Sequence, residues 1–96
     1  MTHHTKIRFR QVLSKGDNGF FLMVEAGRVD HAHHAVQATR ALSETVALDM
    51  AVEKAVEMLE DMGELDDTLI IVTADHAHTM SISGYAQRGI DIRGDL

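Results

Sequence analysis

The stretch that decides the fold is FFLMVEAGRVDHAHH, residues 20–34. Phe20–Val24 is a continuous apolar run that ends at Glu25, and Asp30 and three histidines follow within the same stretch. An apolar run without polar alternation is typical of a strand buried on both faces, as in a parallel sheet that helices cover. The sequence therefore predicts a buried strand that delivers carboxylates and imidazoles to its carboxyl end.

A second apolar run, Leu69–Val72, ends in the same way, because Thr73-Ala74-Asp75-His76-Ala77-His78 follows it directly. This run is rich in β-branched residues, which favour strands. In an open α/β sheet, function gathers at the carboxyl ends of the strands, and parallel strands place those ends at one edge. We therefore expect the two Asp/His groups to converge, although they are far apart in the chain.

Between the two apolar runs, the spacing predicts a helix from about Asp30 to Met62. Apolar positions recur at steps of three and four, with glutamates on the other faces. These positions are Ala38, Ala41, Thr45, Leu48, Val52, Ala55, Leu59 and Met62. Gly63 follows the last of them, as a helix-terminating glycine would. Strand, helix and strand form a right-handed βαβ unit. The predicted fold class is α/β, a βαβ piece of a mostly parallel, helix-covered sheet.

The flanks carry weaker patterns. Residues 1–14 fit both an alternating strand and a short helix, and we favour the helix, with His3 and His4 exposed. Lys15–Gly19 is rich in turn residues. A short strand is expected around Met80 and Ile82. Two strands with one helix cannot cover both faces of a sheet, so we expect the chain to be a piece of a larger α/β domain.

Composition excludes several classes of function. The 96 residues carry a net charge of −6, with no basic cluster beyond Lys6, Arg8 and Arg10, which argues against a nucleic-acid partner. The absence of cysteine removes thiolate zinc sites. No apolar run approaches the roughly 18 residues that cross a bilayer, and the N-terminus lacks the apolar core of a signal peptide.

The polar residues after the two strands have the spacing of a metal site. Asp30 and His34 are four residues apart, so one helical turn points both to the same place, while His31 and His33 are expected to point elsewhere. The adjacent Asp75–His76 pair would face opposite ways on a regular strand. Joint ligation by this pair therefore requires that the strand has already ended.

The mixed carboxylate and imidazole set favours zinc, with manganese or iron as alternatives, over calcium. Glu25 could serve a harder, oxygen-seeking ion such as magnesium beside the zinc pair. His78 could orient a ligand carboxylate. Against this stands a simpler interpretation, in which each histidine is a surface or hydrogen-bonded residue and each aspartate caps a helix.

At these residues the sequence resembles alkaline phosphatases. Residues 19–34, GFFLMVEAGRVDHAHH, resemble the GFFLxVEGGRIDHGHH signature of that family, and residues 68–78, TLIIVTADHAH, resemble its TLxVVTADHSH. Ser83-Gly84-Tyr85, followed by Arg88-Gly89, resembles the continuation of the motif. Residues 1–96 are thus identified as a partial alkaline phosphatase domain of the animal-like branch. The match is clearest over 15–94 and poor over 1–14.

The resemblance implies a hydrolase that cleaves phosphate monoesters through a phosphoserine intermediate, with two Zn²⁺ ions and one Mg²⁺ ion. The residues that match its metal ligands are Glu25, Asp30, His34, Asp75 and His76. His78 matches a histidine that contacts the ligands and does not itself bind the metal. Glu25 matches a magnesium ligand. The first Asp/His pair matches ligands of the zinc that activates water, and the second pair matches ligands of the zinc that activates the serine.

The resemblance also implies a homodimer that is extracellular or at the cell surface, with membrane attachment only through a lipid anchor outside this chain. The family's Asp-Ser-Ala nucleophile segment, a third zinc-binding histidine and the phosphate-binding arginine do not occur in this sequence, so the isolated chain is expected to be inactive. Two alternatives remain. One is a non-enzymatic metal-binding fragment, and the other is a different metal-dependent phospho- or sulfo-ester hydrolase, against which the GRVDHAHH run argues.

Overall fold

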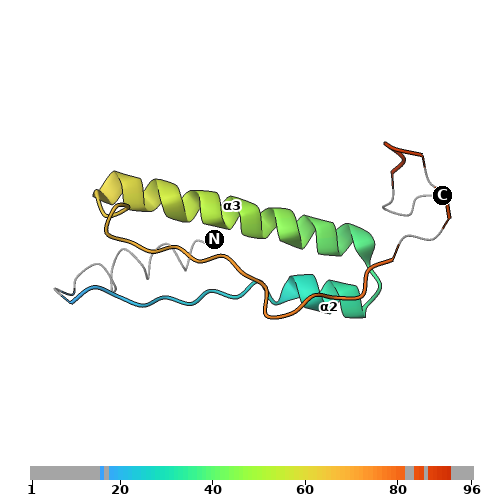
Figure 1. Ribbon diagram of the computed structural model, residues 1–96, viewed down its shortest axis with the longest axis horizontal. Coiled ribbons are helices and arrows are strands. Elements are labelled where there is room, and N and C mark those ends of the chain that lie inside the picture. Colours follow the sequence, from blue (N-terminus) through green and yellow to red (C-terminus); the bar gives the residue numbers. More distant parts are fainter. Residues whose placement is uncertain (1–15, 17, 82–83, 86, 92–96) are drawn as a thin grey trace. The chain divides into compact units, whose positions relative to one another are not determined.

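The computed structural model describes residues 16, 18–81, 84–85 and 87–91. Across these residues the regular elements are two helices, α2 (Arg28–His34) and α3 (Ala38–Met62), both labelled in Figure 1. The chain divides into two compact units. One takes in the residues up to Glu25 together with Ala47–Leu69, and the other takes in Ala26–Val46 together with the residues from Ile70 onward.

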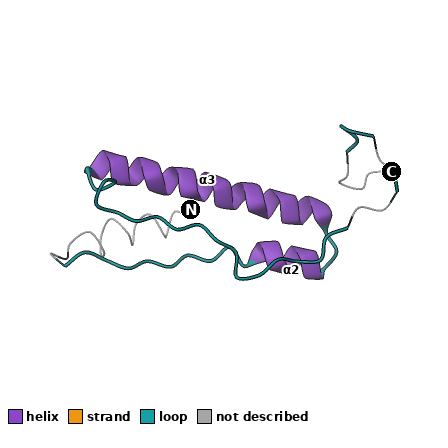
Figure 2. Cartoon of the chain, in the orientation of Figure 1, coloured by secondary structure: helices purple, strands orange, loops and turns teal. Residues whose placement is uncertain are grey.

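The two predicted strands are not formed. Phe20–Val24 and Leu69–Val72 have no regular secondary structure, and Figure 2 shows no strand in the described part of the chain. Both runs are exposed, with 90% of the Phe21 surface and 83% of the Leu69 surface accessible. A strand is defined by hydrogen bonds to neighbouring strands, and a doubly buried one also needs a helix on each face. The helical part of the predicted βαβ unit is present, and its sheet is not.

Helix α3 has the predicted periodicity. Alanine, leucine, methionine and glutamate dominate its 25 residues, and all four favour helices. Seven of the eight predicted apolar positions are buried or half-buried, and Ala41 and Leu59 are among the most buried residues described. Glu53, Glu57 and Glu60 are exposed. Most of the predicted apolar positions are therefore shielded from solvent. Two positions depart from the prediction, because Thr45 is exposed and Glu44, expected on an outer face, is half-buried.

The C-terminus of α3 is closed by Gly63, as the sequence predicts. Gly63 has a φ of 72° and donates its N–H to the Glu60 carbonyl at 2.9 Å. The N–H of Glu64 donates to the Leu59 carbonyl, also at 2.9 Å. This pair of bonds is the Schellman motif, which requires a residue in the left-handed conformation at the position of Gly63.

The predicted continuous helix from Asp30 to Met62 is wrong between His34 and Ala38. Helix α2 ends in a second Schellman motif, in which the Val36 N–H donates to the His33 carbonyl at 3.0 Å and the Gln37 N–H donates to the Ala32 carbonyl at 2.9 Å. Val36 has a φ of 55°, a left-handed conformation that β-branched residues rarely adopt. The sequence offered no glycine or proline to mark this break.

The remaining predictions fall partly outside the described residues. Residues 1–14, with their predicted short helix and the exposed His3 and His4, lie outside them, as does Ile82 of the predicted tail strand. Met80 is described and lies in no strand. Gly19 has a φ of 72°, in keeping with the predicted turn. Neither α2 nor α3 has the combination of length and apolar content that a membrane-crossing helix needs.

Candidate metal centre

Helix α2 positions the first Asp/His pair. Its first turn is closed by the Val29 N–H, which donates to the Ala26 carbonyl at 3.1 Å, and Asp30 lies in that turn. One helical turn later, the Nε2 atom of His34 lies 3.4 Å from the Oδ2 atom of Asp30. The four-residue spacing therefore places the two side chains together, as a helix does for residues four apart.

The segment after the second apolar run brings two more histidines to the same carboxylate. The Nε2 atoms of His76 and His78 lie 3.9 and 3.8 Å from the Oδ1 atom of Asp30. In Figure 1 this segment, drawn in orange, passes along α2. Residues from the two motifs thus meet at Asp30, although the expected sheet does not hold them there.

Asp75 and His76 lie in a bend rather than on a strand. The Nε2 atom of His76 is 3.2 Å from the Oδ2 atom of Asp75, so the two adjacent side chains turn to the same side. Asp75 itself is largely exposed, with 85% of its side chain accessible. The bend thus turns the two side chains to one side, as joint ligation requires, although Leu69–Val72 before it is not a strand.

His78 lies against two imidazole rings from α2. The rings of His33 and His78 are stacked, with centroids 5.0 Å apart and planes inclined by 16°. The ring of His34 meets His78 edge-on, with centroids 4.8 Å apart and an interplanar angle of 90°. The prediction that His33 points elsewhere is therefore wrong. Its three-residue spacing from Asp30 was the available signal, since residues three apart also share a helix face.

The donor groups at this cluster fit a divalent metal ion. One ligand atom each from Asp30, His34 and His78 lies within 4.8 Å of the others. The Oδ1 atom of Asp30 and the Nδ1 atom of His78 are buried without a hydrogen-bond partner. A buried polar atom without a partner is costly, and a cation would satisfy the carboxylate oxygen. Carboxylate oxygen and imidazole nitrogen are donors that zinc accepts.

Two residues considered at the sequence level stand apart from this cluster. Glu25 is exposed and belongs to the other compact unit, so the structure does not place it relative to Asp30. His31 is exposed on α2, and its carbonyl accepts the Ala35 N–H at 3.1 Å. The cluster in the second unit is therefore built from Asp30 and His34 of α2, together with His76 in the bend and His78 after it.

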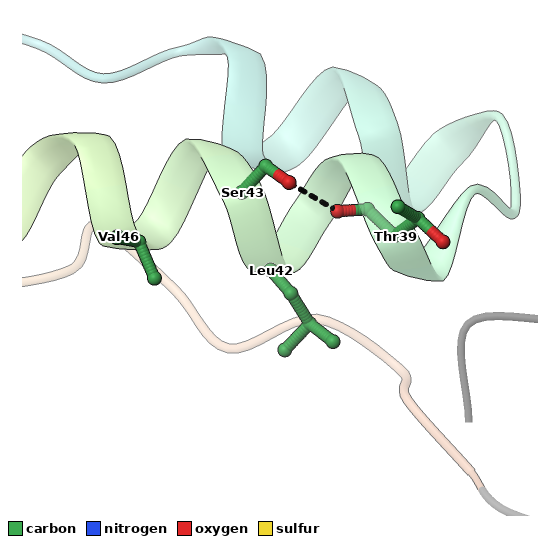
Figure 3. A pocket seen from close by; sticks show the side chains of 4 residues that line it. All are labelled: Thr39, Leu42, Ser43 and Val46. Carbon is green, nitrogen blue, oxygen red and sulfur yellow. Dashed lines mark hydrogen bonds between the residues drawn. The ribbon is translucent and has the colours of Figure 1, made fainter. Parts of the chain in front are cut away.

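A hollow of about 320 Å³ on α3 is a different kind of feature. Figure 3 shows its lining, which comprises Thr39, Leu42, Ser43 and Val46. The Ser43 hydroxyl donates to the Thr39 carbonyl at 2.9 Å within the helix. The lining contains no titratable group, so this hollow offers no metal ligand and no activated nucleophile.

Comparison with known proteins points to one family. The family model for alkaline phosphatase matches residues 3–95. The chain is 50% identical over 86 residues to the membrane-bound alkaline phosphatase of Bombyx mori. It is 45% identical over 84 residues to the tissue-nonspecific alkaline phosphatase isozyme of Homo sapiens. These matches cover 90% and 88% of this chain, but only 15% of the length of each relative. No solved structure matches the chain.

Proposed function

We propose that this chain, which belongs to the alkaline phosphatase family, carries about half of the metal ligands of a zinc- and magnesium-dependent phosphatase. The enzyme would hydrolyse phosphate monoesters through a phosphoserine intermediate. The observation that carries this proposal is the convergence at Asp30, where a carboxylate meets imidazoles from both sequence motifs. Such a mixed set is typical of catalytic zinc sites.

The two Asp/His pairs would hold the two zinc ions. Asp30 and His34 would ligate one ion, and the 3.4 Å between their side-chain atoms supports this pairing. Asp75 and His76 would ligate the other, supported by their 3.2 Å separation in the bend. When bound, a zinc pair stabilises the attacking and leaving oxygens of an in-line displacement. This chain's own contribution would be to hold the two pairs near each other, which the 3.9 Å between Nε2 of His76 and Oδ1 of Asp30 supports.

Two further residues would complete the arrangement. Glu25 would ligate magnesium, which prefers carboxylate oxygens. His78 would orient the Asp30 carboxylate, a role supported by the 3.8 Å between its Nε2 atom and Oδ1 of Asp30. Supporting partners of this kind fix the direction of a ligand's lone pair.

The sheet belongs to the same proposal. We propose that Phe20–Val24 and Leu69–Val72 are parallel strands in the complete protein, where other strands and helices cover them. Their exposure supports this, because soluble proteins rarely leave contiguous apolar runs in water. The chain spans about 15% of its relatives' length, so most of the covering elements would come from sequence outside it.

The wider properties are proposed from the relatives. Phosphate monoesters are the proposed substrates. The complete protein would be a homodimer, extracellular or at the cell surface, with membrane attachment only through a lipid anchor outside this chain. One relative is described as membrane-bound, which supports a surface location.

A chimera tests the function directly. The 86 matching residues of the Bombyx mori enzyme would be replaced by the corresponding residues of this chain, and turnover of p-nitrophenyl phosphate would be measured at alkaline pH. We expect an active chimera whose rate falls by a factor of about 100 or more on Asp30→Ala or Asp75→Ala, since metal ions stabilise the transition state by several kcal/mol. Asp49→Ala, on an exposed face of α3, should leave the rate unchanged.

The isolated 96-residue chain, loaded with zinc and magnesium, should show no turnover, because its sequence contains no Asp-Ser-Ala nucleophile segment. Zinc-dependent turnover that Asp75→Ala abolishes would make the chain a minimal phosphatase and contradict this expectation. A chimera that binds zinc without turnover would favour the alternative, a metal-binding segment without chemistry. The closeness of His78 to Asp30 and His34 is the observation in favour of that alternative.

A further inference from the structure

We propose that His33 is a positioning residue, which holds the ring of His78 so that its Nε2 atom faces Asp30. The inference rests on the proposed function, in which Asp30 is a zinc ligand and His78 orients it. His33 matches none of the proposed ligands, and the sequence placed it away from the site. The structure places its ring on the face of His78.

The geometry limits the ways in which the His78 ring turns. His33 covers one face at a centroid distance of 5.0 Å and an angle of 16°, and His34 meets it edge-on at 4.8 Å and 90°. These are the offset-stacked and T-shaped arrangements that aromatic rings prefer. Only 24% of the His78 side chain is accessible. Rotation of the ring out of its present plane would disturb both contacts.

The same geometry argues that His33 acts through His78 rather than as a ligand. A ring stacked nearly parallel to His78 directs its nitrogen lone pairs along its own plane. The three residues whose ligand atoms converge within 4.8 Å are Asp30, His34 and His78. His33 is outside this group, although it lies beside two of its members. What His33 contributes is therefore the flat face of its ring.

The consequence is a graded effect on metal affinity. Loss of a direct partner of a metal ligand typically weakens binding by roughly 10–100-fold. His33 would act less directly on the metal, because its ring contacts His78 and not the proposed ligand Asp30. We expect its loss to weaken zinc binding by about threefold to tenfold, below that range. A substitution that keeps a flat ring should keep the affinity.

The experiment combines zinc titration by calorimetry with NMR spectra of the histidine rings, both on the 96-residue chain. His33→Ala removes the stacked ring, and His33→Phe keeps a flat ring without nitrogens. His31→Ala is the matched control, because His31 is an exposed histidine on the same helix. The NMR arm follows the ring signals of His78 and their nuclear Overhauser contacts with the His34 ring, and it needs no metal.

The proposal expects that His33→Ala shifts the His78 ring signals, removes their contacts with His34 and weakens zinc binding. His33→Phe and His31→Ala should keep both properties. It is overturned if His33→Ala leaves the His78 signals unchanged, or if His33→Phe loses as much affinity as His33→Ala, since a nitrogen of His33 would then be the active group. If the unsubstituted chain binds no zinc, the proposed metal site fails, and the NMR arm still decides the positioning role.

Discussion

Helices α2 and α3 end with the same pattern of two backbone hydrogen bonds, but with different residues at the critical position. In α3 this residue is Gly63, at a φ of 72°, and in α2 it is Val36, at a φ of 55°. Glycine adopts the left-handed conformation without a steric penalty, whereas other L-residues pay roughly 1–2 kcal/mol. Val36 is 91% exposed, so burial of its side chain does not offset that cost.

The two helix ends also differ in their relation to the candidate site, because the end of α2 directly follows His33 and His34. Helix α3 has 25 residues and ends in the other compact unit, with a residue suited to the turn. Helix α2 has seven residues, two of which are His33 and His34, directly before its strained end. Isolated helices this short are marginal in water. Backbone strain of this kind tends to occur at functional sites, and here it fixes the end of the helix that presents the cluster.

We expect the largest change in stability when Gly63, at the end of α3, is replaced by valine, the residue that ends α2. Gly63→Val should destabilise the chain by about 1–2 kcal/mol through the left-handed conformation alone, because a Cβ at Gly63 would meet no atom within 4 Å. Urea unfolding followed by circular dichroism measures this change. Gly63→Asn is the control and should cost less, since asparagine tolerates this conformation. Equal stability of the valine variant would show that the cap of α3 carries no conformational demand.

The reverse substitution, which places glycine at the end of α2, should change the stability by a smaller amount. Val36→Gly relieves the strain of about 1–2 kcal/mol but adds chain entropy, so we expect a net gain of about 0.5–1 kcal/mol in the local stability of α2. Hydrogen exchange of the Gln37 amide, which is bonded to the Ala32 carbonyl, reports it. The matched control is Val46→Gly, at an exposed position within α3, where the same substitution should destabilise by about 0.3–0.5 kcal/mol, the difference in helix propensity between glycine and valine. The same sign at both positions would contradict the argument.

The contrast also shows what the sequence could predict. Helix α3 and its end at Gly63 were predicted, because periodicity and terminal glycine are local signals. The break at Val36 was not, because no local rule places a β-branched residue in a left-handed turn. The strands Phe20–Val24 and Leu69–Val72 were predicted from apolar pattern, yet pairing is non-local and the described chain supplies no ladder for them.

For the candidate site, the sequence predicted the meeting of Asp30 with His34 from their four-residue spacing. It also predicted that His76 would approach from the second motif, although for a different reason, since the expected sheet edge is not formed. The stack of His33 on His78 was missed, because contacts between side chains of distant segments depend on how those segments pack. The ligand roles themselves stay a prediction until a metal is bound.

We expect the smallest change in stability from an ion pair in the middle of α3, away from both of its ends. Lys54 pairs with Glu57, and this hydrogen bond and charge raise the pKa of Lys54 above its usual 10.5. A raised lysine pKa means that the pair stabilises the helix at pH values below the ordinary pKa, and that this contribution is lost as pH rises through the raised value. Helicity should therefore fall slightly as the pH rises above about 10.5.

In Lys54→Met this fall in helicity should be smaller, because position 54 then carries no ammonium to titrate. The measurement is circular dichroism across the alkaline range, with Glu57→Gln as the second variant that removes the pair. An identical alkaline decline in all three chains would show that the pair contributes nothing to the helix. That outcome would place the stability differences of α3 in its cap and its buried apolar positions alone.

The most direct test of the account compares the two helix ends with and without zinc. Backbone hydrogen exchange would be followed at Val36 and Gln37, which close α2, and at Gly63 and Glu64, which close α3. If α2 carries the metal site, zinc should slow exchange at the first pair and leave the second pair unchanged, and Asp30→Ala should abolish the difference. Unchanged exchange at Val36 and Gln37, or equal slowing at both ends, would contradict the claim that the Asp/His cluster on α2 is the metal centre.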